Sequence, residues 1–469
     1  MAVATTIEGP LTRLEAADFW HMAPSERKPV LLEAIAEAHA WHYERNPAYR
    51  RLVQTRGMGP QLRGADLSRV LRTTAQAFKS YINVIGSAFP QQRPQAFLHW
   101  LADNLSVPLP RERFQQFEPN YGSLEALLQQ FEAVFKDFGF EVTTSSGTSG
   151  RATIMVRDRQ TVDVAVDCFV QATLAFLGVG SEHNAIFMMP RQTRIAMART
   201  ARFATKRLGM QERGQVHFTI PFPADPDRVR IRAGRTFQSG WRGAIERRFT
   251  HRIAQWMDEH YVQPRAVDQT IELLKQAEQS KAPTLVFGGL VQLHALSQQL
   301  KNEGYGTNGH RIRLSSDSLV GTGGGLKEHY PYSPERIRRD IESVLALESG
   351  DPVPIRDVMG MAEANWAAPQ CPEGNYHLPP WVYAVALDDD DEILPGPDVV
   401  GLLGFLDPLG SGRLFPSFFK STDQVRLVNG TSHYDPALCC ACGHDTPYLV
   451  NGTIRRIDLL EEAGCAGQL

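Results

Sequence analysis

The stretch "EVTTSSGTSGRATIMVRD", Glu141 to Asp158, decides the fold that we expect for this chain. Six consecutive small residues, 145–150, stand between two segments whose apolar and β-branched residues predict strands. Gly147 and Gly150 allow positive φ, so successive N–H groups can face one concavity that suits phosphate oxygens. The hydroxyls of the run add side-chain donors. The alternative is a flexible turn of small residues without a ligand.

This loop is not of the Walker A type. That motif requires Gly-Lys followed by Ser or Thr at the start of a helix, whereas Gly150 is followed by Arg151 and Ala152. The phosphate-binding hypothesis therefore concerns a loop that joins two strands.

Length and charge bound the classes of function. A chain of 469 residues exceeds the size at which one hydrophobic core keeps growing, so we expect at least two subdomains. A net charge of −3 argues against a general role at nucleic acids or membrane surfaces. The N-terminus shows no basic start followed by an apolar run, and no segment approaches eighteen uninterrupted apolar residues. We therefore expect a cytoplasmic protein.

The pattern along the chain predicts three regions. Residues 1–120 form a helical region, 121–380 an α/β core, and 381–469 a small β region with a short tail. From Ala266 onward, helices alternate with short apolar strands, which predicts a mainly parallel sheet whose ligands gather beyond the carboxyl ends of its strands. The acidic run 388–392 is interpreted as a hairpin tip.

Three helices are predicted from the spacing of apolar residues. They cover residues 25–57 with a break at Asn46-Pro47, residues 124–138, and residues 160–177. Arginine is dense between Pro190 and Arg252. The simpler interpretation of this density is a solvated face with local ion pairs, and the alternative is a docking surface for an acidic partner.

Three motifs follow the loop in order: "GTGGGLKEHY" (321–330), "VMGMAEAN" (358–365) and "FFKSTDQVRL" (418–427). With the loop, they resemble the adenylate-forming enzymes, which join a carboxylate to AMP. The sequence is most similar to the acyl-protein synthetase component of bacterial bioluminescence fatty-acid reductases, and next to phenylacetate-CoA ligases, whose Asn-Pro-x-Tyr-Arg element resembles "RNPAYRRL" (45–52). The resemblance implies an α/β fold: a large N-terminal domain of mainly parallel sheets covered by helices, plus a small antiparallel β unit. The full mobile C-terminal domain of the superfamily is expected to be absent.

The resemblance also implies a site for ATP and Mg²⁺. The residues implied to cradle phosphates or to pack against adenine are Ser145, Ser146, Gly147, Thr148, Ser149, Gly150, Gly323, Gly324 and Gly325. Lys327 is implied to reach a phosphate or the substrate carboxylate. Glu363 matches the magnesium-binding glutamate, although the preceding Tyr-Gly-x-Thr of the family is Met-Gly-Met-Ala here (359–362).

Asp423 matches the aspartate that accepts hydrogen bonds from both ribose hydroxyls, with Thr422 in place of the family's glycine. Lys420 and Arg426 flank it, as basic residues do in the phenylacetate ligases. The alternative for Glu363 and for Asp423 is an ordinary surface carboxylate.

Four of the six cysteines gather late in the chain: Cys371, Cys439, Cys440 and Cys442. With His377 they can supply a tetrahedral, sulfur-rich site of the kind that holds Zn²⁺. A similar Cys and His pair followed by Cys-x-Cys-Gly in some phenylacetate-ligase relatives implies the ligands Cys371, His377, Cys440 and Cys442. Spacing alone equally allows Cys439 with Cys442. Thiols without a metal are the alternative, and His444 is interpreted as a turn residue.

The predicted activity is ATP-dependent formation of an acyl-adenylate and transfer of the acyl group to a thiol. Likeness to the bioluminescence synthetases suggests an acyl-accepting cysteine near the C-terminus, which Cys465 in "EAGCAGQL" matches. Glu461 and Glu462 disfavour its thiolate, so a passive tail cysteine is the alternative. A partner reductase, a carrier protein or CoA are other acceptors. The alternative activities are an acyl- or aryl-CoA ligase and, from another class, a catalytically degenerate nucleotide-binding or docking protein.

Overall fold

The computed structural model describes residues 16–86, 88–145, 152–232, 236, 240–325, 330–409 and 412–457. The chain divides into two compact units, each assembled from segments that are distant in the sequence. Unit 1 comprises residues 1–144, 153–171 and 361–461, and unit 2 comprises residues 145–152, 172–360 and 462–469. The three regions predicted from the sequence stay a prediction, because a grouping by contacts does not show which part folds on its own.

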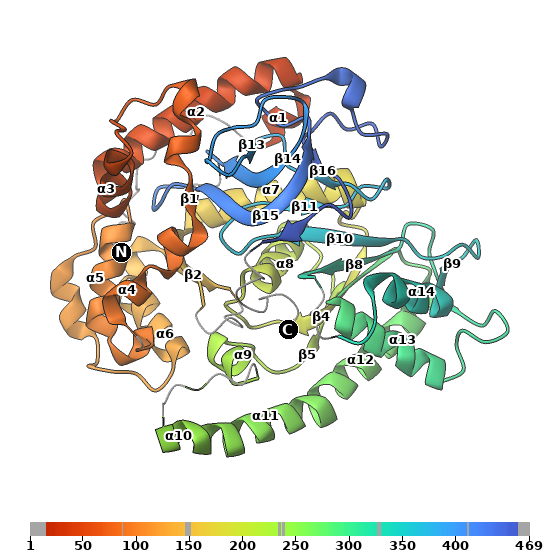
Figure 1. Ribbon diagram of the computed structural model, residues 1–469. Helices are drawn as coiled ribbons and strands as arrows, with labels where there is room; N and C mark the ends of the chain where they lie inside the picture. The colour runs from red at the N-terminus through yellow and green to blue at the C-terminus, as the bar shows by residue number, and fades with distance from the viewer. Residues whose placement is uncertain are drawn as a thin grey trace. The chain divides into compact units, whose positions relative to one another are not determined.

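Unit 1 combines the N-terminal helices with a largely antiparallel sheet (Figure 1). Its helices are α1 (Ala16–His21), α2 (Pro24–Arg45), α3 (Pro47–Thr55), α4 (Tyr81–Ile85), α5 (Pro94–Asn104) and α6 (Leu124–Val134). Its strands are β1 (Arg72–Thr73), β2 (Phe140–Thr144), β3 (Ile154–Asp158), β11 (Ala367–Pro369), β12 (Tyr376–His377), β13 (Tyr383–Leu387), β14 (Asp398–Leu406), β15 (Phe418–Val428), β16 (Tyr448–Leu449) and β17 (Arg455–Arg456). The main sheet has the order β12-β16-β15-β14-β13, and β1 and β17 also pair with β15. The predicted antiparallel β unit is confirmed.

The predicted break in the first long helix is confirmed at Asn46. Helix α2 ends at Arg45 and α3 begins at Pro47, where a proline suits the first helical turn. The Asn46 side chain caps α3 by accepting a hydrogen bond from the N–H of Tyr49 at 2.9 Å. The predicted helix 124–138 is shorter than expected: α6 ends at Val134, and a 3₁₀ turn covers Lys136–Phe138.

Unit 2 is built on a parallel sheet. Its strands are β4 (Asn184–Pro190), β5 (Val216–Ile220), β6 (Thr284–Phe287), β7 (Ile312–Leu314), β8 (Leu319–Gly323), β9 (Leu345–Leu347) and β10 (Ile355–Gly360). The order β10-β8-β6-β4-β5 is parallel at every pairing, and β7 pairs with β9. Its helices are α8 (Ala196–Arg207), α9 (Pro226–Arg232), α10 (Gly240–Ile245), α11 (Arg252–Met257), α12 (Gln263–Ser280), α13 (Leu290–Asn302) and α14 (Pro334–Val344). This parallel sheet confirms the prediction from the alternating pattern.

The core of unit 2 lies between this sheet and helices α12, α13 and α14, which Figure 1 shows beside it. Leu274 and Leu293 on two of these helices are fully buried with Val286 and Val320 on neighbouring strands. Such continuous apolar strands are typical of parallel sheets that helices cover. The core therefore fixes β8, and the predicted glycine motif begins at the carboxyl end of this strand.

Helix α7 (Arg159–Leu177) begins in unit 1 and ends in unit 2. Among the described residues it is the one helix long and apolar enough to cross a membrane by length and composition, and 39% of its most apolar window is buried. The core helices of soluble proteins meet the same criterion, so the finding is weak evidence for a membrane span. The cytoplasmic location stays a prediction.

The acidic run 388–392 forms a tight turn after β13. The N–H of Asp388 donates to the carbonyl oxygen of Glu392 at 3.0 Å, and Leu387 bridges Ile393 across the turn. Asp391 takes a left-handed conformation with φ of 65°, which aspartate tolerates better than most residues. The hairpin-tip interpretation is confirmed.

Candidate functional site

The opening stretch folds as two antiparallel strands. Strands β2 and β3 pair from Phe140 opposite Asp158 to Thr144 opposite Ile154, so the small-residue run lies at the open end of this pair. Ser145 follows β2 directly. The rest of the predicted phosphate loop, Ser146, Gly147, Thr148, Ser149 and Gly150, lies outside the described residues, and its role stays a prediction.

Glu363 is hydrogen-bonded to the end of this loop segment. Thr153, which directly precedes β3 and is fully buried, donates from Oγ1 to Oε1 of Glu363 at 2.7 Å. The two residues are 210 positions apart in the sequence. The fold therefore joins the predicted magnesium-binding carboxylate to the chain three residues after Gly150.

Arg157 on β3 holds the segment that carries Glu363. Its Nε donates to Oδ1 of Asn365 at 2.6 Å, and its Nη2 donates to the carbonyl oxygen of Ala362 at 3.0 Å. Burial lowers the pKa of Arg157 to about 10, and the carboxylates of Glu363 and Asp407 oppose this shift. Because this value still lies well above neutral pH, the guanidinium stays charged and acts as a fixed fork of donors.

Thr153 and Arg157 are functional candidates that the sequence reasoning missed. Every residue of β3 is buried, so Arg157 is a buried charge that follows three apolar residues of the strand. A buried charge is costly unless it is paired and hydrogen-bonded. The Arg in "IMVRD" was therefore the available signal, although its partners could not be read from the sequence.

Asp423 lies in an irregular part of β15. Leu402 of β14 faces Gln424, whereas Gly404 faces Lys420. The register therefore shifts here, because an advance of two residues along β14 corresponds to four residues along β15. Asp423 pairs instead with Arg456 of β17, and its N–H donates to Oγ of Ser421 at 3.0 Å. Bulges of this kind re-aim side chains and are frequent beside active sites. The half-buried Asp423 carboxylate thus belongs to a stretch that has left the regular β14–β15 register.

Lys420 and Arg426, the basic residues that flank Asp423, each pair with another carboxylate. The Nζ of Lys420 binds both carboxylate oxygens of Asp391 in the acidic turn. Arg426 makes a bidentate pair with Asp398, with N–O distances of 2.8 and 2.6 Å, which lowers the pKa of Asp398. Both pairs join neighbouring parts of unit 1, and the catalytic roles implied for the two residues stay predictions.

The glycine motif lies at the carboxyl end of β8 in unit 2. A Cβ on Gly323 would approach the carbonyl oxygen of Val358 on β10 to 3.1 Å, so the neighbouring strand requires a glycine there. Gly324 and Gly325 have φ of 85° and 68°, a region that favours glycine. The chain therefore turns sharply at the edge of the sheet where ligands of parallel sheets bind. Lys327 lies outside the described residues, as does Cys465.

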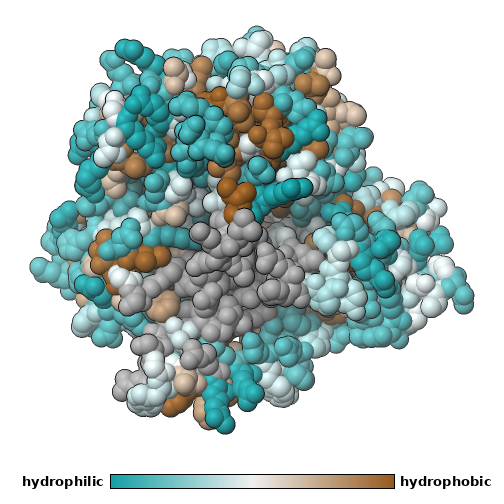
Figure 2. All heavy atoms as spheres, in the orientation of Figure 1, coloured by the Kyte–Doolittle hydropathy of each residue, from teal (hydrophilic) through white to brown (hydrophobic). Residues whose placement is uncertain are grey.

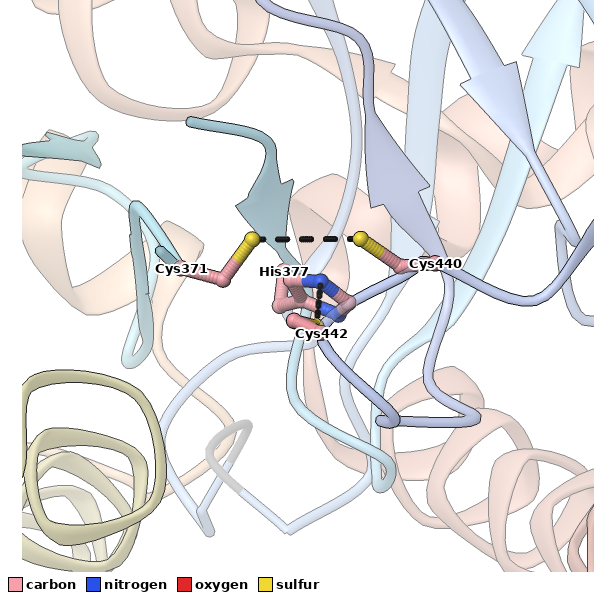
Figure 3. A group of neighbouring side chains, drawn as sticks. All are labelled: Cys371, His377, Cys440 and Cys442. Atoms are coloured by element: carbon pink, nitrogen blue, oxygen red, sulfur yellow. Dashed lines mark hydrogen bonds between the residues drawn. The ribbon is translucent and has the colours of Figure 1, made fainter. Parts of the chain in front are cut away.

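The predicted metal ligands come together in unit 1 (Figure 3). Cys371, His377, Cys440 and Cys442 have ligand atoms that all lie within 4.8 Å of one another. The Sγ atoms of Cys371 and Cys440 are 3.8 Å apart, and Sγ of Cys442 is 3.3 Å from Nε2 of His377. Tetrahedral zinc with Zn–S bonds of about 2.3 Å places two sulfurs about 3.8 Å apart, so the sulfur spacing fits a shared metal and not a disulfide.

Neighbouring groups orient this cluster. Nδ1 of His377 lies 2.8 Å from the hydroxyl oxygen of buried Thr446, which leaves Nε2 toward the sulfurs. Burial lowers the pKa of His377 to about 3, so the imidazole is neutral, as a metal ligand must be. Asn375 directs its side-chain N–H toward Sγ of Cys440 at 3.5 Å. Partners of this kind fix the orientation of metal ligands.

The structure also decides between the two cysteine pairings that spacing allowed. Cys439 is exposed, and its Sγ lies 3.0 Å from the hydroxyl of Tyr434, outside the cluster. His444 packs edge-on against Trp20 and is not among the clustered ligands of the described residues. Cys440 is therefore the partner of Cys442.

Comparisons with known proteins agree with the motifs. Residues 255–469 match the family model for acyl-protein synthetase, LuxE. The resemblance to the acyl-protein synthetases is confirmed. Two similar relatives are the long-chain-fatty-acid–luciferin-component ligases of Aliivibrio fischeri and Vibrio harveyi, which are 26% and 27% identical over 202 residues, or 42% of this chain. The match covers 48% of each relative, so the chain spans about half the length of the curated relatives it matches.

Solved structures show the fold of this chain. It is similar to an open conformation of 2-hydroxyisobutyryl-CoA ligase in complex with 2-HIB-AMP and CoA, with a TM-score of 0.56 and 14% identity over 97% of this chain and 80% of that one. The same ligase in its thioesterification state gives a TM-score of 0.56 and 15% identity over 98% of this chain and 75% of that one. The predicted adenylate-forming α/β fold is confirmed. The expected absence of a mobile C-terminal domain stays a prediction.

Proposed function

We propose that this protein uses ATP to activate a carboxylic acid as an acyl-adenylate and passes the acyl group to a thiol. The observation that carries the proposal is the match of residues 255–469 to the acyl-protein synthetase model. The adenylate-forming fold supports it. The names of the two relatives specify long-chain fatty acids, so we propose a fatty acid as the substrate class.

The chemistry requires two anions, the acid and the ATP phosphates, to be held together. Glu363 is anchored by Thr153 and by the segment that Arg157 clamps, which suits a carboxylate that must keep one orientation. We propose that it holds Mg²⁺, which would neutralise charge on the phosphates. The N–H and hydroxyl donors of residues 145–150 would orient the same phosphates.

The sugar and the base would be held by other segments. The Asp423 carboxylate offers two acceptor oxygens, one for each ribose hydroxyl. Gly323, Gly324 and Gly325 would allow the backbone to approach adenine closely. Lys327 would donate to the carboxylate or to a phosphate, so that the acid oxygen attacks the α-phosphorus and pyrophosphate leaves.

A thiolate would then attack the acyl carbon and form a thioester while AMP leaves. We propose Cys465 as the first candidate acceptor, by its match to the synthetases. A reductase or carrier protein, and CoA, are the other acceptors that the relatives and the fold allow.

We also propose that Cys371, His377, Cys440 and Cys442 hold a structural Zn²⁺. Both the 3.8 Å sulfur spacing and the neutral, oriented imidazole of His377 support this set. The ion would join the segment around β12 to the loop that precedes β16, because each segment supplies two ligands. Four protein ligands would fill the coordination sphere, which is typical of a structural and not a catalytic zinc.

The test is carboxylate-dependent exchange of pyrophosphate into ATP, measured across fatty, aryl and amino acids. Exchange with a long-chain fatty acid is expected, and Glu363→Gln should reduce it at least tenfold. Glu348→Gln, at a surface carboxylate that pairs with Lys281, serves as the matched control. Absence of exchange with every acid would contradict the proposal and favour a degenerate nucleotide-binding or docking protein.

The acceptor is tested separately with radiolabelled acid. Covalent labelling that is lost in Cys465→Ala identifies the internal thiol. Release of AMP that requires CoA and survives Cys465→Ala identifies a CoA ligase instead.

A further inference from the structure

A continuous helix in unit 2 carries a line of exposed apolar side chains. Helices α10 and α11 and the π-helical segments η7 (Glu246–His251) and η8 (Asp258–Val262) run without a break into α12 (Figure 1). Every fourth residue along them is large and apolar, and the exposed fractions are 69% for Trp241, 49% for Ile245, 58% for Phe249, 57% for Ile253, 47% for Met257 and 59% for Tyr261. We call these six residues the apolar stripe.

The π-helical segments keep this stripe on one face. In an α-helix of 3.6 residues per turn, each step of four residues drifts by about 40°, so five steps would carry the series about 200° around the axis. A π-helical turn contains more residues than an α-helical turn and rotates such a series back. Because α and π segments alternate between Gly240 and Val262, the six residues of the apolar stripe follow a line nearly parallel to the helix axis. π-helices are rare and are often found at functional sites.

Charge is distributed unevenly along the same helix. Residues 240–252 contain four arginines (242, 247, 248 and 252) and one carboxylate, Glu246. Residues 253–262 contain two carboxylates, Asp258 and Glu259, and no lysine or arginine. The first half is therefore basic and the second half acidic. Along the lower edge of Figure 2, where Figure 1 places α10 and α11, hydrophobic and hydrophilic residues lie side by side.

We propose that the apolar stripe binds the same stripe of a second copy of this chain, with the two helices antiparallel about a two-fold axis at the midpoint of the stripe. The midpoint falls at residue 251, so Trp241 would meet the partner's Tyr261, Ile245 the partner's Met257, and Phe249 the partner's Ile253. The basic half of each helix then lies beside the acidic half of the other. A parallel arrangement would place arginine beside arginine.

The exposed area is sufficient for a dimer. Trp256, which is 51% exposed, adds a seventh large side chain to this part of the helix. Four of the seven are aromatic, and four aromatic side chains of roughly 150–250 Å², about half exposed, amount to about 400 Å² before the three aliphatic side chains are added. A standard interface buries roughly 800 Å² on each partner. Monomers seldom expose a contiguous apolar patch of this size.

The charge pattern favours a second copy over a lipid surface. An anionic bilayer would attract the basic half of the helix and repel the acidic half, since its charge has one sign. An antiparallel copy complements both halves. The proposal does not depend on the catalytic function proposed above.

The first test is sedimentation velocity of the full chain at micromolar concentrations. The wild type is expected at about twice the chain mass of 52.3 kDa. Phe249→Glu with Ile253→Glu should raise the dimer Kd by about a hundredfold or more, because it places four carboxylates at the centre of the interface. Phe222→Glu is the matched control, since Phe222 is 46% exposed and lies outside the stripe. Circular dichroism checks that each variant is folded.

The second test exchanges charge between the halves. One variant carries Arg242→Glu and Arg248→Glu, and the other carries Asp258→Arg and Glu259→Arg. Both halves of the helix then carry a net charge of the same sign, negative in the first variant and positive in the second. Each variant alone should therefore dimerise more weakly than the wild type, and an equimolar mixture should recover the dimer. If the mixture does not recover it, the two helices do not face each other across the interface, and the proposal is wrong.

Three further outcomes would overturn the proposal. The first is a wild type that stays monomeric. The second is a dimer that persists in the Phe249→Glu, Ile253→Glu variant, which would place the interface elsewhere. The third is a monomer that co-sediments with phosphatidylcholine–phosphatidylglycerol vesicles, which would assign the stripe to a lipid surface.

Discussion

Replacing Arg157 by methionine should loosen the segment that carries Glu363. Methionine keeps a long stem but removes the charge and every N–H donor of the side chain. The guanidinium donates to Asn365, to the carbonyl oxygens of Ala362 and Ala364, and to Oγ1 of Thr143. All of these acceptors would lose a donor inside the fold.

The size of the effect follows from burial. Arg157 is only 6% exposed, so water cannot replace its hydrogen bonds without opening the structure. Each hydrogen bond to a charged group contributes roughly 1.5–3 kcal/mol, but removing the buried charge also removes its desolvation cost. For the loss of one member of a buried charge network we expect a net destabilisation of about 3–5 kcal/mol. Arg157→Lys keeps the charge without the planar fork and should cost about 2 kcal/mol.

Urea unfolding followed by circular dichroism measures the free energy of unfolding, and pyrophosphate exchange measures the consequence for the proposed site. We expect Arg157→Met to lower the maximal rate of exchange more than it raises the KM for the acid, because Arg157 positions Glu363 and does not contact substrate. If the free energy of unfolding of Arg157→Met lies within about 0.5 kcal/mol of the wild-type value, the reasoning is refuted. A destabilised variant that exchanges pyrophosphate at the wild-type rate while folded would also refute it.

Three other changes have defined outcomes. Thr446→Ala removes the hydroxyl beside Nδ1 of His377, and a chromogenic chelator should show zinc affinity reduced by about 10- to 100-fold. Burial, with smaller contributions from nearby positive groups such as Arg72, holds the pKa of His42 well below its usual 6.5, so the unfolded chain alone takes up this proton as the pH falls below 6.5. Below pH 6.5 the free energy of unfolding should therefore fall with pH more steeply in the wild type than in His42→Asn, by about 1.4 kcal/mol per pH unit. Urea unfolding at neutral and mildly acidic pH measures this difference, and an equal pH dependence of the two proteins would contradict it. Asp423→Asn should raise the KM for ATP by about tenfold, and an unchanged KM would argue against ribose binding by this side chain.

Much of the architecture could be predicted because it depends on local pattern. The two strands around residues 145–150, the break at Asn46 and the parallel sheet all follow from periodicity and from the backbone preferences of Asn, Pro and Gly. The end of α6 at Val134 was not predicted, since the amphipathic pattern continues through a 3₁₀ turn to Phe138.

The metal ligands show the same division. The sequence narrowed them to a few cysteines and one histidine, because zinc requires thiolate and imidazole in closely spaced pairs. It left Cys439 and Cys440 equivalent. Only the fold separated them, by exposing Cys439 and turning Cys440 toward Cys371.

By itself the sequence determined which segments form strands and helices and which residue types could bind a nucleotide, because backbone preference and side-chain chemistry are local properties. The tertiary structure alone decided that Thr153 meets Glu363 and that Arg157 clamps the segment beside it, across more than two hundred residues of chain. It also decided that alternating α and π turns expose one straight apolar stripe. These features depend on long-range packing and on which buried donors find acceptors, and short-range patterns in the sequence do not encode either.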